Sequence, residues 1–284
     1  DNGRSRGLGD VYKRQYWFNG FSEEKDFLFE IGVGFYPNRH IMDAHFSIST
    51  AGKQYSYHAS TRMNPARYPI NIGPISLEIL EPMQKIRFSL KDPEKKLSCD
   101  LIFNAITEPH LEPKSLMIEG TRKILETSRF TQFGKWDGSI ETESGNLDLT
   151  KEYGTRDKSW GVRPVGEPEI GAPEKLNAEP GVYWCWIPIN FGDTFTHFGT
   201  FEDHDGNSTQ LSADLVEISN NEVIKPLNNI SHKVDWIKGT RWSSGAQISA
   251  QEGDKKIEIN AKACGPRFHC KGIGYQHPEW GHGF

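Results

Sequence analysis

The sequence predicts an all-β protein made of two antiparallel β-barrels. Apolar and polar residues alternate with a period of two in many short runs, and turn residues such as Gly, Pro, Asn and Asp separate these runs. Short strands at this spacing are typical of sandwiches and barrels. A chain of 284 residues is long enough for two domains of medium size.

The first half of the chain contains the clearest strand patterns. Residues 27–35 place apolar side chains on one face of a strand and Glu30, Gly32 and Gly34 on the other. The two glycines predict strong curvature, because side chains at these positions would hinder bending. Only residues 113–128 could form a helix longer than two turns. Further strands are expected over residues 42–48, 76–80, 85–90 and 97–106.

The second half of the chain shows the same alternation of apolar and polar residues. Asp205-Gly206 is a strong hairpin signal between two of its runs. Residues 164–180 are rich in Pro, Gly and Glu and are expected to form a long loop over the join between the barrels. We therefore expect an N-terminal barrel at residues 16–150 and a C-terminal barrel at residues 151–284. The strands of the second barrel are expected over residues 183–189, 195–202, 209–218, 234–239, 246–250, 256–263 and 268–275.

The two ends of the chain differ in character from the rest. Asp10-Val-Tyr-Lys-Arg-Gln15 resembles the translation of a transposon end used in preparing sequencing libraries. We therefore expect residues 1–15 to be non-native, and the predicted fold begins at residue 16. Without them the net charge changes from −5 to −7. The chain ends inside an aromatic, strand-like run at residues 280–284, so we expect the C-terminal barrel to be cut short.

The composition argues against several kinds of partner and cofactor. The net charge of −5, without a basic stripe, argues against nucleic acid. No uncharged stretch approaches the ~20 residues that span a bilayer, so no integral membrane association is expected. No P-loop, G-x-S-x-G or dinucleotide fingerprint is present, so no cofactor is expected. Nothing in the sequence indicates an oligomeric state.

The four cysteines do not form a recognised metal site. They lack C-x-x-C spacing, and the run that contains Cys264, His269 and Cys270 matches none of the usual zinc patterns. We therefore expect structural cysteines and no metal. A reduced, cytoplasmic protein is the default expectation, with the native N-terminus and any signal peptide unseen.

The stretch from Tyr153 to Arg163, YGTRDKSWGVR, carries the most information. It resembles the G-x-R-D-x-S-W-G-x-R signature of the hydroxyneurosporene synthase (carotenoid hydratase)-like, tandem-lipocalin family. Weaker similarities to this family lie at residues 76–82, 134–138 and 274–281. The resemblance implies two lipocalin-like barrels packed together, with an apolar cavity near their contact. Characterised relatives handle hydrophobic molecules by hydration, isomerisation or cyclisation, or carry them unchanged.

Adjacent residues of this motif point in opposite directions if the motif is a strand. Asp157 and Ser159 then share one face, while Arg156, Lys158 and Trp160 share the other. In the functional interpretation, surrounding aromatic residues desolvate Asp157, raise its pKa and enable it to donate a proton.

A structural role for the motif is the alternative. Arg156 or Arg163 would then pair with a carboxylate elsewhere, and Trp160 would anchor the join between the barrels. In the functional interpretation the same three residues contact the ligand. The residue types alone leave both interpretations open.

Hydration of an unactivated alkene sets two chemical requirements. A carboxyl group must stay protonated in an apolar site, and aromatic faces must stabilise the cation that forms. Asp157 and His197 are the candidate catalytic residues, although a histidine in the middle of a strand is also a common core residue. The rings expected to contact the ligand are Tyr183, Trp184, Trp186, Phe195 and Phe201.

Strand periodicity restricts which of these rings can act together. Tyr183 faces opposite to Trp184 and Trp186, so only one of these two sets can line a cavity. His197 lies on the same face of its strand as Phe195 and Phe201.

The first barrel offers a second polar group. Asp43 and His45 share the less apolar face of their strand, and Tyr55 and Tyr57 lie close by in sequence. If this face points into the barrel, these residues form a polar patch in an apolar interior. If it points outward, they are ordinary surface residues.

These patterns lead to one functional expectation and two alternatives. We expect the protein to bind a small hydrophobic molecule (an isoprenoid, steroid or other lipid) and to hydrate or isomerise it by acid/base chemistry without a cofactor. The first alternative is a non-catalytic carrier of such a molecule, since barrels of this size can enclose one small ligand. The second is a structural double barrel with filled interiors.

Overall fold

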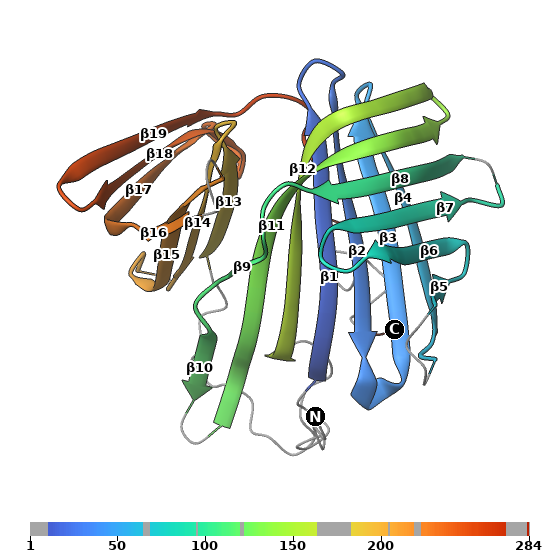
Figure 1. Cartoon of the computed structure of the whole chain (residues 1–284), viewed down its shortest axis with the longest axis horizontal. Helices are drawn as coiled ribbons and strands as arrows, with labels where there is room; N and C mark the ends of the chain where they lie inside the picture. The colour runs from blue at the N-terminus through green and yellow to red at the C-terminus, as the bar shows by residue number, and fades with distance from the viewer. Residues whose placement is uncertain are drawn as a thin grey trace. The chain divides into compact units, whose positions relative to one another are not determined.

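The computed structural model describes residues 11–64, 69–94, 96–119, 122–163, 183–203, 205–218, 223–270 and 283. Apart from one short 3₁₀ turn, Pro37–Arg39, the elements of this part of the chain are all β-strands (Figure 1). The predicted all-β fold class is therefore confirmed. No helix within the described residues is long and apolar enough to cross a membrane.

The chain forms two compact units. Unit 1 comprises Asp1–Ala172 together with Gly265–Phe284, and unit 2 comprises Pro173–Cys264. Residue 150, where the sequence suggested a boundary, lies inside one long strand of unit 1. The last part of the chain returns to unit 1, so unit 2 is attached to unit 1 at both of its ends.

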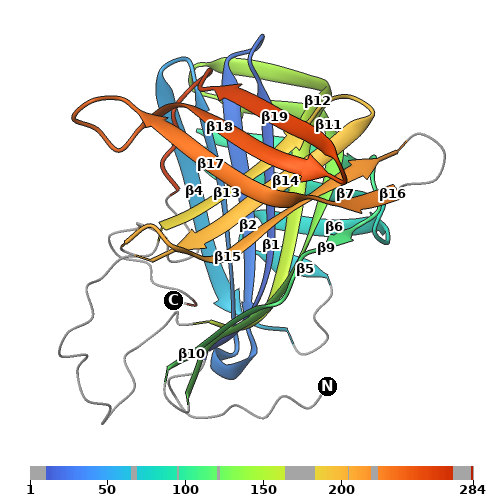
Figure 2. The same cartoon turned by 90° about the vertical axis from the view of Figure 1, so that its left-hand side faces the viewer.

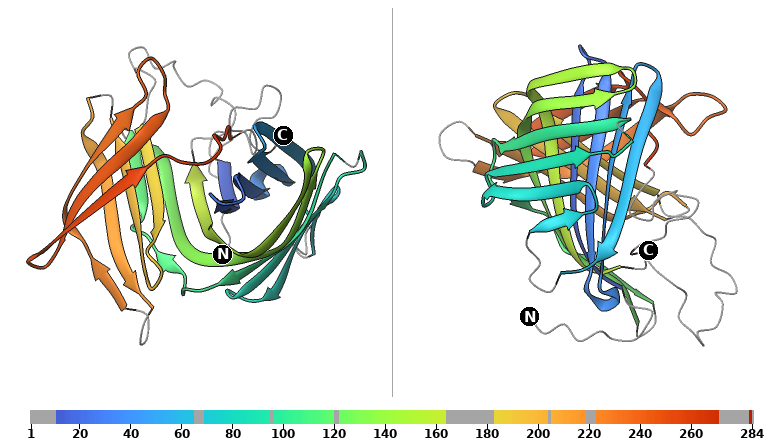
Figure 3. Two further views of the ribbon diagram at one scale, coloured as in Figure 1. Left: turned by 90° about the horizontal axis from the view of Figure 1, so that it is seen from above. Right: turned by 90° about the vertical axis from the view of Figure 1, so that its right-hand side faces the viewer.

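Unit 1 is built on one antiparallel sheet, sheet A, in the order β4-β3-β2-β1-β12-β11-β8-β7-β6-β5, with β9 and β10 paired to β11. The edge strand β5 contacts both β3 and β4, so the sheet curves into a nearly closed barrel (Figure 3). Its strands are β1 (Val11–Ser22), β2 (Phe27–Tyr36), β3 (Ile41–Thr50), β4 (Lys53–Arg62), β5 (Ile70–Ile72), β6 (Ile75–Glu81), β7 (Lys85–Lys91), β8 (Leu97–Ala105), β9 (His110–Leu111), β10 (Ser115–Glu119), β11 (Arg122–Thr142) and β12 (Gly145–Arg163).

Residues 113–128, the one stretch that could have formed a helix longer than two turns, contain strands instead. Strand β10 and the start of β11 pair as a hairpin there. Leu116, Met117 and Ile118 are consecutive and all exposed, so the segment lacks the apolar stripe that stabilises a packed helix. Further along, β11 pairs with β12, and this pairing satisfies its backbone in extended form.

Aromatic rings fill the interior of the barrel. Trp136 is fully buried, with edge-to-face ring contacts to Phe18, Phe29 and Phe103 at centroid distances of 5.7, 5.4 and 5.2 Å. Its indole Nε1 donates a 2.8 Å hydrogen bond to the Asn19 carbonyl oxygen. The indole is therefore fixed both by packing and by its polar atom.

Unit 2 consists of two small antiparallel sheets packed face to face (Figure 2). Sheet B has the order β13-β14-β15-β16, and sheet C the order β17-β18-β19. Phe198 of sheet B packs with Ile248 and Ile259 of sheet C. The strands are β13 (Tyr183–Asn190), β14 (Thr194–Glu202), β15 (Ser208–Glu217), β16 (Val223–Pro226), β17 (Asn228–Trp236), β18 (Ser243–Glu252) and β19 (Lys255–Lys262).

The last predicted strand, residues 268–275, is not formed in its described part. Residues 268–270 have no strand pairing, and the remainder lies outside the described residues, as does the expected loop at 164–180. Residues 268–270 instead contact side chains of β2 and β4, as described below.

We predict that Gly154→Ala destabilises the protein. A Cβ at Gly154 would collide with the indole nitrogen of Trp136 and the carbonyl oxygen of Asn19. Overpacking of this kind costs about 1–3 kcal/mol in the free energy of unfolding, which urea titration would measure. Gly199→Ala is the control, because its added Cβ would meet the nearest atom, Ser212 Oγ, at 3.5 Å. Equal unfolding midpoints for the two variants would contradict the packing described for Trp136.

Candidate functional site

The motif at residues 153–163 forms part of β12, and its side chains alternate as predicted. Arg156 lies inside the barrel, with its guanidinium 5.7 Å from the ring centroid of Tyr16 and 5.2 Å from that of Phe130. The ring of Trp160 packs edge-on against Phe130 at 6.4 Å. Asp157 points to the opposite, outer face of the sheet.

Hydrogen bonds hold the cations at the inner face. Arg156 Nη1 donates to Gln132 Oε1 at 3.1 Å, and Gln132 Nε2 donates to the carbonyl oxygens of Met83 and Thr107. Lys158 Nζ donates to the Tyr16 hydroxyl oxygen at 3.1 Å. These contacts account for the burial of Arg156 by cation–π interactions and amide hydrogen bonds.

Asp157 forms a buried ion pair on the outer face of sheet A. Its Oδ2 lies 2.9 Å from Arg129 Nε, and the residue is 6% exposed. Burial raises the pKa of Asp157, while the adjacent Arg129 guanidinium acts in the opposite direction. Arg129 Nη1 is also 3.8 Å from Glu112 Oε2, so one guanidinium serves two carboxyl groups. Sequence reasoning missed Arg129 and Glu112 as partners of the motif.

Arg163 lies at the end of β12 beside this ion pair. Its Nη2 donates a 2.7 Å hydrogen bond to Ser159 Oγ. Asp157, Ser159 and Arg163 are therefore on the outer side of the sheet, whereas Arg156 and Trp160 are in the barrel interior. The motif residues expected to contact one ligand belong to two different environments.

Strand register places a second carboxyl cluster on the same outer face. Paired residues of antiparallel strands share a face, and one such row runs from Asp157 through Trp17 and Gly32 to His45. The neighbouring row on this face, two residues along each strand, ends at Asp43. At strand spacings of about 4.8 Å, Asp43 and Asp157 are roughly 15 Å apart.

Asp43 and His45 form neither a polar patch inside the barrel nor an ordinary exposed surface, the two alternatives that the sequence left open. These residues point away from the barrel core, yet Asp43 is 3% exposed and His45 is 0% exposed. His45 Nε2 is 2.8 Å from Glu30 Oε1, and Trp17 Nε1 donates to Glu30 Oε2 at 3.2 Å. The outer face is therefore a buried polar network rather than a solvated surface or a polar patch inside the barrel.

Asp43 is the most perturbed carboxyl group of this network. Burial raises the pKa of Asp43 to about 6, against the opposing effect of Lys13, the backbone N–H of Gly283, His45 and the Tyr36 hydroxyl. The Gly283 N–H donates to Asp43 Oδ2 at 3.2 Å. The neutral form of this acid is therefore stabilised close to physiological pH.

The chain that follows unit 2 covers part of this face. Ser49 Oγ donates to the Arg267 carbonyl oxygen at 2.8 Å, and Gln54 Nε2 donates to that of His269 at 2.7 Å. The Cys270 thiol hydrogen-bonds Glu30, and burial raises its pKa. Glu30, His45 and Cys270 carry atoms of the kinds that bind metals, and here they bond one another.

Lys13 is fully buried next to the same network. Its Nζ lies 5.7 Å from the ring centroid of Tyr36, and burial, aided by the Arg163 charge, lowers the pKa of Lys13 to about 7. Lys13 belongs to the segment expected to be non-native. For that reason no functional role proposed below depends on it.

In unit 2 the predicted rings divide between the two faces of sheet B, as alternation required. Tyr183 points toward sheet C, together with Cys185 of the unit 2 core. Trp184 lies on the other face and stacks on Trp186 at 6.4 Å and on Phe201 at 6.0 Å. Phe195 and His197 share that face, and both are buried.

A family model and solved structures match this chain. The family model described as "Family of unknown function (DUF8625)" matches residues 5–284. The chain belongs to this family. No curated protein matches the sequence at a significant level.

Two solved structures share the fold of this DUF8625 member. An AttH-like protein (NE1406) from Nitrosomonas europaea has a TM-score of 0.58 and 14% identity, covering 91% of this chain and 85% of that one. Kievitone hydratase from Nectria haematococca has a TM-score of 0.53 and 11% identity, covering 91% and 80%. At these identities the likeness shows the fold alone, which is lipocalin-like.

We predict that Lys13→Met stabilises the protein. The unfolded chain protonates Lys13 below pH 10.5, whereas the folded chain does so only below about pH 7. Wild-type stability is therefore reduced most at pH 7 and below, and it recovers as the pH rises toward 10.5. The gain from Lys13→Met should be on the order of several kcal/mol at pH 7 and shrink by pH 10.

Urea titrations at pH 7 and pH 10 would measure this gain, with Lys53→Met at an exposed position as the control. A loss of stability in Lys13→Met at pH 7, or an equal gain in both variants, would contradict the burial of this lysine.

Proposed function

We propose that this protein binds a small hydrophobic molecule, of isoprenoid, steroid or other lipid type, and hydrates or isomerises it without a cofactor. The observation that carries the proposal is the burial of Asp157 with a raised pKa, inside the motif that resembles the hydroxyneurosporene synthase-like family. The fold shared with a protein named kievitone hydratase supports the reaction class by analogy. Membership of the hydroxyneurosporene synthase-like family is part of this proposal.

The proposed chemistry begins with a proton on a buried carboxyl group. Asp157 transfers this proton to one alkene carbon, and the adjacent carbon becomes a cation. A water oxygen then bonds to the cation and its surplus proton returns to the carboxylate. In an isomerisation, the cation instead loses a proton from a neighbouring carbon to the Asp157 carboxylate.

The Arg129 guanidinium contacts two carboxyl groups, which makes it compatible with both protonation states of Asp157 in this cycle. It contacts Asp157 at 2.9 Å and Glu112 at 3.8 Å, and Glu112 is itself buried. When Asp157 is protonated, Glu112 still balances the arginine charge, so the neutral acid does not leave an uncompensated buried cation. When Asp157 is ionised, the same arginine stabilises it.

Other predicted residues take supporting roles in the proposal. His197 stays the second predicted catalytic residue, and within unit 2 the predicted rings Trp184, Trp186, Phe195 and Phe201 lie on its face of sheet B. Asp43, with a pKa of about 6, is a further acid that sequence reasoning did not assign to catalysis. Arg163, on the same outer face as Asp157, remains a proposed ligand contact. Arg156 and Trp160 in the barrel interior, and Tyr183 on the face of sheet B opposite to Trp184, stay predicted contacts that cannot share one ligand surface with these residues.

The Arg129–Asp157 ion pair also favours a second candidate function. A buried ion pair perturbs a pKa without doing chemistry, and the protein would then be a carrier that releases its ligand unchanged. Native mass spectrometry of the purified protein would show such a ligand directly.

We predict that Asp157→Asn abolishes turnover with little change in melting temperature. Removal of a general acid lowers the rate roughly 10²–10⁴-fold, while the amide can still accept a hydrogen bond from Arg129. The assay is incorporation of oxygen from oxygen-18 water into a panel of isoprenoid and steroid alkenes. Asp100→Asn is the control, because Asp100 pairs with Arg87 at an exposed position.

The carrier function predicts a different result. Asp157 would then be an ionised anchor, and its replacement would break the nearer of the two ion pairs of Arg129 and destabilise the protein by about 3–5 kcal/mol. Absence of labelled product from wild-type protein across the panel, with an intact co-purifying lipid, would reject the hydratase and support the carrier.

A further inference from the structure

A cleft opens between the two sheets of unit 2. It has a volume of about 280 Å³ and is lined by residues of β13, β14 and β17. Tyr183 and Glu202 come from paired positions on sheet B, while the other side comes from sheet C. None of these residues has a role in the function proposed above except Tyr183. The lining residues are Tyr183, Glu202, His232, Val234 and Trp236.

The cleft contains a carboxylate oxygen whose hydrogen bonding is incomplete. Glu202 Oε1 is buried and accepts no hydrogen bond from the residues that the structure describes. His232 Nε2 lies 2.8 Å away, close enough for an ion pair but without the alignment of a hydrogen bond. Phe198 fixes the imidazole by a ring contact at 4.9 Å. A buried acceptor of this kind calls for a donor, because burial without one is costly.

Apart from Glu202 and His232, the groups of the cleft are apolar or already hydrogen-bonded. The Tyr183 hydroxyl donates to the Cys185 sulfur, and burial raises the pKa of Tyr183, so the phenol stays neutral. The Tyr183 ring meets Trp236 edge-to-face at 6.4 Å. Trp236 is 51% exposed and forms the rim. The walls therefore suit an aromatic or alicyclic ring, and Glu202 Oε1 is the hydrogen-bond acceptor left for it.

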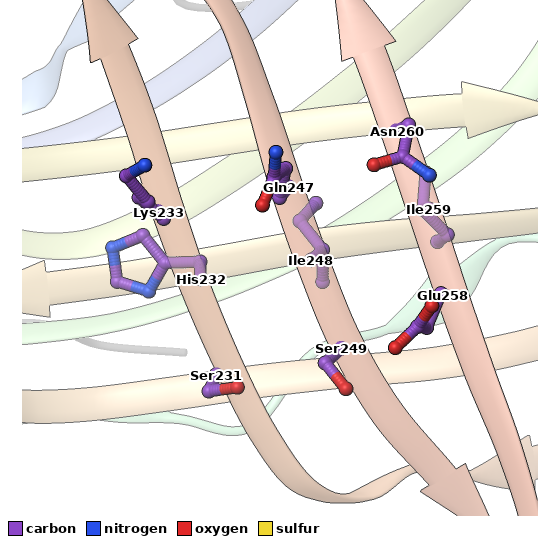
Figure 4. A pocket seen from close by; sticks show the side chains of 9 residues that line it. All are labelled: Ser231, His232, Lys233, Gln247, Ile248, Ser249, Glu258, Ile259 and Asn260. Atoms are coloured by element: carbon purple, nitrogen blue, oxygen red, sulfur yellow. The ribbon is translucent and has the colours of Figure 1, made fainter.

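The outer face of sheet C carries a different hollow, of about 210 Å³ (Figure 4). His232, Ile248 and Ile259 are paired across the three strands and form one row, which faces the unit 2 core. The flanking rows are polar, and their members such as Lys233 and Glu258 are exposed. This hollow offers only solvated groups, so the inner cleft is the stronger candidate for a neutral ligand.

We propose that the inner cleft binds a small neutral phenol, whose hydroxyl group donates to Glu202 and whose ring packs against Trp236 and Tyr183. Cavities near 150 Å³ bind benzene, so a cleft of about 280 Å³ has room for one ring with a short side chain. The carboxylate disfavours anionic ligands. This site is separate from the chemistry proposed for Asp157, and neither proposal depends on the other.

The test compares 4-propylphenol with its methyl ether 4-propylanisole, in which a methyl group replaces the hydroxyl hydrogen and removes the donor. Titrations of the full ¹⁵N-labelled chain, followed by NMR, report both the affinity and the site. The phenol should shift the amide signals of Glu202 and His232 and bind about tenfold more tightly than the ether, as expected for a hydrogen bond to a carboxylate. Equal affinities, or shifts confined to Gln247 and Glu258 on the outer face, would overturn the proposal.

Variants separate the hydrogen bond from the packing. Glu202→Met keeps a side chain of similar length and should bind the phenol and the ether equally. Glu258→Met on the outer face should retain the preference for the phenol. Trp236→Ala, at the exposed rim, should keep the fold and weaken both ligands alike. A preference for the phenol that survives in Glu202→Met would refute the role of Glu202, whatever the outcome of the oxygen-18 assay.

Discussion

The part of the outer face of sheet A that carries Asp43, Glu30 and Asp157 is buried, so each of these groups has to be compensated within the protein. His45 contacts Glu30, Arg129 contacts Asp157, and the Gly283 N–H donates to Asp43. Desolvation then raises the pKa of Asp43 and Asp157 against these partners. The same loss of water that makes the network costly also makes it chemically useful, because it favours neutral acids on a rigid sheet.

The fold class could be predicted because alternation is a local property. It identified most strands and the opposed faces of the motif, including Asp157 against Arg156. Alternation does not show which strands pair when they are far apart in the sequence. Residues 113–128 have reasonable helix propensity, but the pairing of β10 with β11, and of β11 with β12, holds them in extended form. No local signal shows that Gly265–Phe284 rejoins unit 1 after unit 2.

The candidate site was only partly predictable for the same reason. Periodicity puts Asp43 and His45 on the face opposite to the apolar one, but it does not say what covers that face. A compositional signal was present: this face of β3 continues with Ser47 and Ser49, whereas the exposed face of β7 carries Lys85, Arg87 and Lys91. Small polar residues without lysines suggest burial. Arg129 and Glu112, by contrast, become neighbours of Asp157 only through strand register.

The chain returns to unit 1 only after unit 2, and this order affects when the barrel's side-chain contacts can form during synthesis on the ribosome. Strands β1 to β12 are synthesised first, and the residues that bond Ser49, Gln54 and Glu30 emerge only after all of unit 2. Until then Asp43 lacks the backbone N–H of Gly283, and Glu30 lacks the thiol of Cys270. The environment of Asp43 is therefore completed only after the whole of unit 2 has been synthesised.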